Sequence, residues 1–437
     1  MRKTTNKQNT KEQTMLHNLF TRFLQSVDSI ARNRAYMLLG GVFILLVASG
    51  IFYKKANRFA DVDSHIPATI LALQYGYDLE GYGLSFVSAN GIEDTYGNGA
   101  LRILNEGIVP DSFSHYRSTI GVQGFFYAWL YQSLGLENLK PLYKLTAFCN
   151  ALALLMCAIL LGKIFGRAFG IIFFLSLFTS GWVANFGGSL YFSFAFWILP
   201  AIIAFSLYRV AATQNKLSKT TLTLFCLAYM FAIALRASMS YEFLTSIILF
   251  SLSPFIVSFI YGVLTSYQSP FLSLSVKKAF KYGLGLFILA CVGFLLTFII
   301  HTYIRGGGDL WAGLMDIYHN DFLRRMVGGN PKDFHPGYAP SLTANAFEVI
   351  KIYLSKPFLL FLLGVSMLVC LVESNKSYRN FYIALLICFA LPAISWFVLG
   401  KSHSYLHTHF CFVLWYLGFW ASIIYIPLHY FYRKKIA

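Results

Sequence analysis

The stretch GKSHSYLHTHF, residues 400–410, places one lysine and three histidines between two apolar runs. Such side chains can bind phosphate, ligate a metal ion or carry protons. His403 and His407, four residues apart, share a helix face, but His409 does not, so the stretch alone does not form a three-ligand metal site. The pattern favours binding of a donor phosphate or another substrate group by Lys401, His403, His407 and His409. A divalent metal ion and histidines without a special role are the alternatives.

The backbone at the end of this stretch gives a further reason to expect an anion. If an apolar helix begins near His407, its first N–H groups lack partners and carry partial positive charge. An anion such as phosphate is favoured at that point. Lys401 would strengthen the same site.

A second polar stretch, DVDSH at residues 61–65, directly follows the first apolar run. A positioned carboxylate can accept the proton of a substrate hydroxyl, so Asp61 and Asp63 are candidate catalytic bases. Two solvated aspartates are the simpler interpretation of this spacing. Glu93 and Asp94, the nearest adjacent acid pair, could supply the base instead or bind the acceptor.

A third stretch, LRASMSYEF at residues 235–243, puts Arg236 and Glu242 at the ends of two apolar runs. Ionisable residues at membrane depth are costly, and they are usually functional or paired. Arg236 is therefore a candidate donor-phosphate ligand, and Glu242 is a candidate acceptor ligand or alternative base. A purely structural Arg–Glu pair that fixes a helix hairpin is an equal alternative.

The elements that position these residues are apolar helices. The chain of 437 residues is 57% hydrophobic and only 12% charged, which indicates a polytopic membrane protein of the all-α class. A spanning helix needs roughly 20 apolar residues. About ten runs meet this requirement, at residues 36–53, 142–162, 168–184, 190–208, 220–237, 242–264, 283–304, 356–373, 381–399 and 410–430.

The net charge of +17 comes from short basic clusters between apolar runs, which argues against a nucleic-acid partner. After the first run these clusters recur at every second loop, so the positive-inside rule places both termini in the cytoplasm of a cell inner or plasma membrane. In this topology fifteen of the eighteen acids and eight of the ten histidines lie outside, and the active face is the outer one.

The topology divides the chain into two parts. Residues 1–35 form a cytoplasmic amphipathic segment, and residues 36–437 form a single transmembrane domain with external loops at 54–141 and 305–355. Residues 118–136 are apolar enough to span, but counting them would invert every later loop, so we interpret them as a re-entrant or interfacial helix. Glycine and proline in 305–355 predict turns and a mobile lid, with anion donors at Arg305, Arg324, Arg325 and Lys332.

Taken together, an uncleaved first span, a long outer segment opening with DVDSH, short basic inner loops and an outer rim with Arg, Lys and His resemble the GT-C superfamily of integral-membrane glycosyltransferases. The resemblance implies a base at Asp61 first and Asp63 second, a polyprenyl-phosphate-linked sugar donor, and a glycan, lipid or protein acceptor. An acidic pair as tight as Asp-Glu after the first span is absent here. A helix at residues 61–63 would separate the two carboxylates, so we expect direct displacement with inversion.

Other classes stay open. A lipid-linked polysaccharide polymerase or ligase would use the 305–355 loop rather than Asp61. A lipid or glycan transporter would need polar residues along a midplane pathway, and the predicted span interiors hold almost no charges. A purely structural protein would not need acids and histidines gathered on one face.

Overall fold

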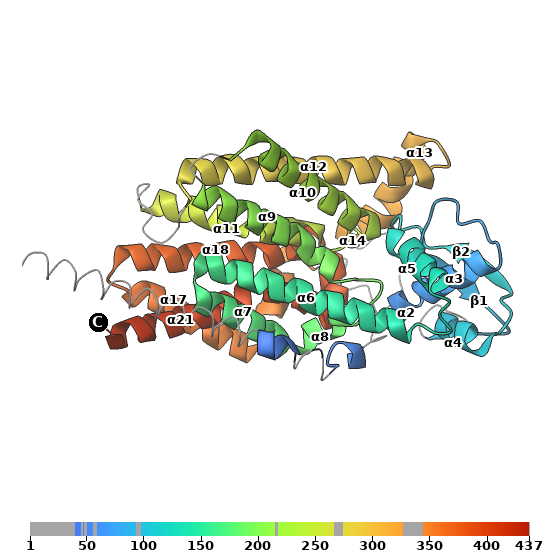
Figure 1. The fold of residues 1–437 in the computed structure, drawn as a ribbon, viewed down its shortest axis with the longest axis horizontal. Coiled ribbons are helices and arrows are strands. Elements are labelled where there is room, and N and C mark those ends of the chain that lie inside the picture. Colours follow the sequence, from blue (N-terminus) through green and yellow to red (C-terminus); the bar gives the residue numbers. More distant parts are fainter. Residues whose placement is uncertain are drawn as a thin grey trace, which may run out of the picture.

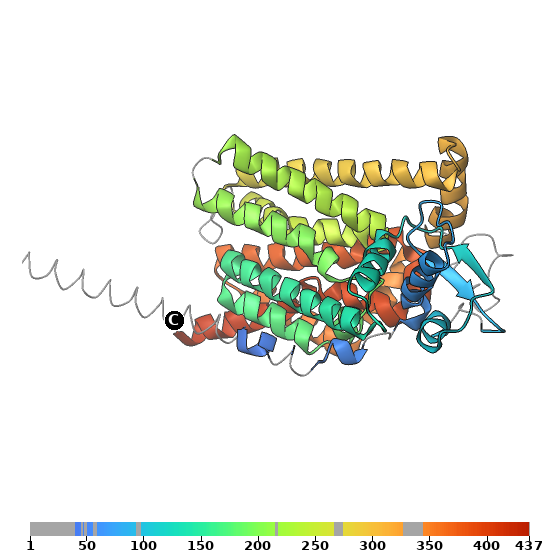
Figure 2. The same cartoon turned by 45° about the vertical axis from the view of Figure 1, so that its right-hand side comes forward.

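The computed structural model describes residues 40–44, 47, 50–55, 59–92, 98–214, 217–265, 274–326 and 344–436, and it is a helical bundle with a small cap at one end (Figures 1 and 2). Five helices of the described residues are long and apolar enough to cross a membrane. They are α6 (Lys140–Phe165), α9 (Ala195–Thr213), α10 (Lys219–Met239), α12 (Val276–Arg305) and α18 (Lys376–Leu399).

Four further segments pass the same test only as bent pairs. They are α7 with α8 (Arg167–Phe178 and Gly181–Gly187, 75°), the two halves of α11 (Leu244–Leu264, 58°), α16 with α17 (Ala346–Leu354 and Pro357–Val372, 93°), and α20 and η5 with α21 (Thr408–Cys411, Phe412–Tyr416 and Phe419–Ile436, 45°). The bend in α11 falls beside Pro254. Proline bends a helix because it has no N–H to donate and its ring clashes with the preceding turn.

The described part of the chain therefore holds five to nine candidate spans. These confirm a helical membrane protein, and they coincide with nine of the ten predicted runs. The remaining run, residues 36–53, is described only in part, and the amphipathic segment 1–35 lies wholly outside the described residues. The full count of ten spans stays a prediction.

The basic clusters lie at the end of the bundle opposite the cap, which we call the basic end (Lys163, Arg209, Lys376 and Arg433). Arg209 Nη1 donates to the Lys163 carbonyl at 2.9 Å, which joins the ends of α9 and α6. Arg433 of α21 pairs with buried Glu373, just before α18. Figure 1 shows the C-terminus at this end, on the left, with the cap on the right.

The cap consists of the described residues between 59 and 139. It contains α2 (Ala60–Asp63), α3 (His65–Gln74), β1 (Ser85–Ser88), α4 (Gly99–Glu106), β2 (Ser112–His115) and α5 (Val122–Ser133). The strands pair antiparallel, with Ser85 opposite His115. The segment expected as an external loop is thus built mainly of short helices, and its two four-residue strands were not predicted.

Two predictions about outer segments can be compared directly with the structure. α5 has 12 residues, about 18 Å of helix at 1.5 Å per residue, which is too short for a hydrocarbon core of about 30 Å. α5 alone is therefore too short for an ordinary span, and the interpretation of 118–136 as a re-entrant or interfacial helix stays a prediction. The turns predicted after residue 305 are present at 306–308, and the chain then continues as α13 (Leu310–Ile317), η2 (Tyr318–Phe322) and α14 (Leu323–Met326), helices that were not predicted.

Sequence signals explain this helical continuation. Three glycines reverse the chain after α12, and Gly307 and Gly308 have φ of 58° and 100°, which favours glycine. The Asp309 carboxylate then caps α13 by accepting from Trp311 N at 2.8 Å and Ala312 N at 3.1 Å. Residues 327–343 lie outside the described residues.

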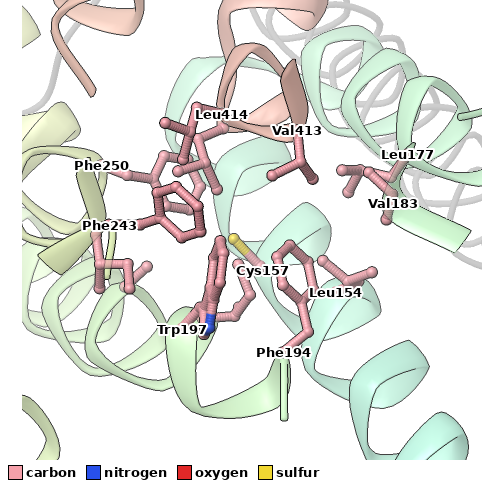
Figure 3. Close-up of a cluster of buried hydrophobic side chains, with 14 of the residues drawn as sticks. Leu154, Cys157, Leu177, Val183, Phe194, Trp197, Phe243, Phe250, Val413 and Leu414 are labelled. Atoms are coloured by element: carbon pink, nitrogen blue, oxygen red, sulfur yellow. The ribbon is translucent and has the colours of Figure 1, made fainter. Parts of the chain in front are cut away.

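Packing in the core of the bundle fixes the turn that contains Glu242 and Phe243. Figure 3 shows Trp197 of α9 beside Phe243, which directly precedes α11, with side chains from α6, α8 and η5 around them. The two ring centroids are 4.9 Å apart, and both residues are fully buried. Phe243 has φ of 60°, so the chain turns sharply there. Packing of Phe243 thus fixes the position of its neighbour, Glu242.

Candidate functional site

The centre of the site is a carboxylate–imidazole pair at the capped end of the bundle. Glu242 lies in the turn between α10 and α11, and His403 lies in α19 (Lys401–Leu406). Glu242 Oε1 is 3.4 Å from His403 Nε2, and both side chains are nearly buried. Arg236, in the last turn of α10, donates from Nη2 to the Glu242 carbonyl at 3.0 Å. Three predicted site residues, from two stretches far apart in the chain, therefore meet.

Arg236 is held by the bundle rather than by a carboxylate. Its side chain is fully buried, and its Cζ lies 5.4 Å from the centre of the Trp197 ring. A cation over an indole face is stabilised by the ring quadrupole. The predicted Arg236–Glu242 hairpin contact exists, but it goes to the main-chain carbonyl, so the Glu242 carboxylate stays directed toward His403.

Several buried polar atoms here have no hydrogen-bond partner among the described residues. They are Glu242 Oε2, Arg236 Nε and Nη1, Arg325 Nε and His407 Nδ1. An unsatisfied buried polar atom costs roughly 1–3 kcal/mol, so proteins rarely retain several together without a use. The arrangement suits a ligand that offers both acceptors for the arginines and a donor for the carboxylate.

The other predicted histidines extend from this pair toward the surface. The His407 ring lies 4.6 Å from the His403 ring and 5.4 Å from that of exposed His409. Lys401 begins α19 and is half-buried. α20 begins at Thr408 with His407 as its N-cap and continues into η5, so a helical segment does start where the sequence placed it. Binding of an anion at this point stays a prediction.

Burial, with a smaller effect of the nearby His403, lowers the pKa of His407 to about 3. His407 is therefore neutral at physiological pH, and it can offer a neutral N–H or a lone pair rather than a positive charge. The described residues contain no group of three His, Cys, Asp or Glu side chains arranged to hold a metal ion. The described part of the chain therefore offers no set of ligands for the divalent metal considered as an alternative.

Arg325 of α14 completes the site from the second external segment. Its Nη1 donates to Asp321 Oδ1 at 2.9 Å, and Arg305 Nη2 approaches Asp321 Oδ2 at 3.4 Å. Arg305 also pairs with Asp316, so α13 and α14 are tied to the end of α12. We call Arg236, Glu242, Arg325, His403 and His407 the rim cluster.

The charges of the rim cluster act on Glu242. Burial alone would raise its pKa, but the hydrogen bond and electrostatic attraction of His403 outweigh burial, and Arg325 adds to them. The resulting pKa of Glu242 is about 2. The carboxylate is therefore ionised at physiological pH and able to accept a proton.

Asp63 lies in a different setting from the one predicted. It is fully buried, and its Oδ1 accepts from Ser189 Oγ at 2.7 Å and from Tyr191 N at 2.9 Å. These bonds tie α2 of the cap to the loop between α8 and α9. The predicted helix at residues 61–63 is confirmed as α2, while Glu93 and Asp94 lie outside the described residues.

Aromatic residues connect Asp63 to the rim cluster. Tyr191 Oη is 3.4 Å from Tyr116 Oη, and the Tyr116 ring lies 4.3 Å from that of His65. Burial raises the pKa of Tyr116, and the Glu242 carboxylate raises it further, so this tyrosine stays protonated as a donor near the cluster. Sequence reasoning missed Tyr116 and Tyr191. The signal for Tyr191 is the run SLYFSF after a glycine pair, and Tyr116 lies outside that run, in SHYRS.

Four predicted residues, Arg236, Glu242, His403 and His407, thus form one cluster, and Asp63 connects to it through Tyr191. Searches against models of protein families, curated proteins and solved structures found no match for this chain.

Proposed function

We propose that this protein is a membrane glycosyltransferase of the GT-C type. It moves a sugar from a polyprenyl-phosphate-linked donor to a glycan, lipid or protein acceptor. The observation that supports this most is a buried, ionised carboxylate, Glu242, held by His403 near buried Arg236 and partly buried Arg325 at the rim of an apolar bundle. A lipid-linked donor needs this combination, because its chain requires an apolar environment and its phosphate requires cations.

In this proposal Arg236 and Arg325 bind the donor phosphate. Guanidinium groups match phosphate oxygens with paired N–H donors, and charge-assisted bonds are the strong ones. Both arginines have buried N–H groups without a partner among the described residues. Lys401, His403, His407 and His409 line the path from this site toward the surface, where the acceptor enters.

Glu242 acts as the base in this proposal. The acceptor hydroxyl gives its proton to Oε2 while its oxygen attacks the anomeric carbon and the bond from that carbon to the phosphate oxygen breaks. Direct displacement inverts the anomeric centre. Bound phosphate places a negative charge near Glu242, which raises the pKa of its carboxyl and makes it a stronger base. Asp61 is the alternative base that the sequence favours.

The test is incubation of the purified protein with a panel of polyprenyl-phosphate sugars and acceptors. We expect one donor to be consumed with release of polyprenyl phosphate. Arg325→Gln should weaken donor binding by about 10- to 100-fold, the range expected for a lost charge-assisted bond. Arg102→Gln, which removes an exposed arginine paired with Glu106 in the cap, is the matched control.

Consumption of no donor in the panel would contradict the proposal. Consumption only of a polyprenyl-diphosphate-linked glycan, with release of the diphosphate carrier, would point to the polymerase or ligase class instead.

We also propose that the cap lies outside the cell and the basic end in the cytoplasm. Gln74 of the cap and Gln214 after α9 are both exposed, so each can be replaced by cysteine in a background without the seven native cysteines. An impermeant thiol reagent added to intact cells should label position 74 and should label position 214 only after permeabilisation. The opposite labelling pattern would invert the topology.

A further inference from the structure

One face of α5 exposes aromatic side chains. Phe126 and Trp129 are 45% and 60% exposed, and Phe125 beside them is partly exposed. The opposite face, with Gln123 and Tyr127, is buried. In water, such a row of aromatic side chains would be an unfavourable apolar patch.

The packing of α5 prevents it from rolling to hide this face. A Cβ on Gly124 would lie 1.7 Å from the Gly83 carbonyl oxygen, so the helix backbone rests directly on the segment before β1. Gln123 Nε2 donates to the Met239 carbonyl at 3.1 Å and to the Tyr191 carbonyl at 3.4 Å. The aromatic face must therefore point away from the protein.

Two contacts set the depth of α5 relative to the spans. Gly121 N donates to the Ser238 carbonyl at 2.8 Å, in the last turn of α10. Tyr127 Oη is 2.8 Å from Thr146 Oγ1, near the start of α6. Both α6 and α10 are candidate spans. α5 thus lies at the level where two spans leave the membrane, between the bundle and the strands in Figure 1.

We propose that α5 is an interfacial helix whose Phe125, Phe126 and Trp129 insert between the headgroups and acyl chains of the membrane that the bundle spans. Trp is favoured at this depth because its ring is apolar and its N–H can bond to headgroups or water. The spans that α5 contacts carry exposed apolar side chains of their own, such as Phe148 and Phe231. This proposal is independent of the proposed function.

The experiment compares wild-type protein with Trp129→Phe in vesicles of brominated phosphatidylcholine. Bromine on the acyl chain near the headgroup should quench a tryptophan component that bromine near the bilayer centre quenches less. This component should be lost in Trp129→Phe. Equal quenching profiles in wild type and variant would overturn the proposal, as would a Trp129 signal quenched by aqueous acrylamide and not by lipid.

Trp311→Phe is the matched control, because Trp311 of α13 is 68% exposed and its removal also leaves six of the seven tryptophans. The shallow component assigned to Trp129 should persist in this variant. If it disappears in Trp311→Phe and persists in Trp129→Phe, the interfacial element is α13 and the proposal for α5 is wrong.

Discussion

Glu242→Gln should reduce turnover about 100- to 10,000-fold, the contribution expected of a positioned general base. Glutamine preserves the shape of the side chain, and its carbonyl oxygen can still accept from His403 Nε2, which lies 3.4 Å from Oε1. Donor affinity should change little, because the arginines stay in place. The measurement is single-turnover transfer from the lipid-linked donor, with donor binding determined separately.

Asp61→Asn is the comparison that identifies the base. If Glu242 is the base, Asp61→Asn should keep most of the wild-type rate. Loss of turnover in Asp61→Asn with near-normal turnover in Glu242→Gln would assign the base to Asp61, as the sequence alone favours. Full activity in both variants would show that neither Glu242 nor Asp61 is the general base.

Asp63→Ala should destabilise the protein by about 3 kcal/mol, because hydrogen bonds to a charged group contribute about 1.5–3 kcal/mol each. The substitution leaves Ser189 Oγ and Tyr191 N without the carboxylate that accepts from them in a buried loop. We expect a lower midpoint of thermal unfolding in detergent and weaker attachment of the cap to the bundle. Circular dichroism and protease sensitivity of the cap would measure the two effects.

Asp63→Asn is the control for this second prediction. The asparagine carbonyl can still accept both bonds, so the loss of stability should be smaller and turnover should stay near that of wild type. An Asp63→Asn variant that is stable but inactive would show that Asp63 takes part in the chemistry and does not merely position the cap.

The sequence predicted the helices well because their apolar runs have the length that a bilayer requires. It did not predict where helices bend, since a bend such as the 58° break in α11 depends on packing as well as on Pro254. The strands of the cap were missed because Ser85–Ser88 and Ser112–His115 are too short to show a period of two clearly.

The site was predicted in composition and not in geometry. Arg236 and Glu242 stood out because charges at span ends are costly, and His403 because it lies in a polar stretch between apolar runs. Which of them pair depends on contacts between segments far apart in the chain, and a single sequence does not show such contacts. The burial of Asp63 was missed for the same reason, because its partners lie on a loop more than a hundred residues away.

The pairing of Glu242 with His403 also bears on how the protein is made. His403 is synthesised about 160 residues after Glu242, which corresponds to roughly 8–30 s of translation at 5–20 residues per second. During this interval Glu242 and Arg236 have already left the ribosome, and the imidazole that will meet the carboxylate does not yet exist. The nascent chain must therefore hold an uncompensated carboxylate near the membrane surface. Insertion of the last two membrane segments, with α19 between them, completes the site.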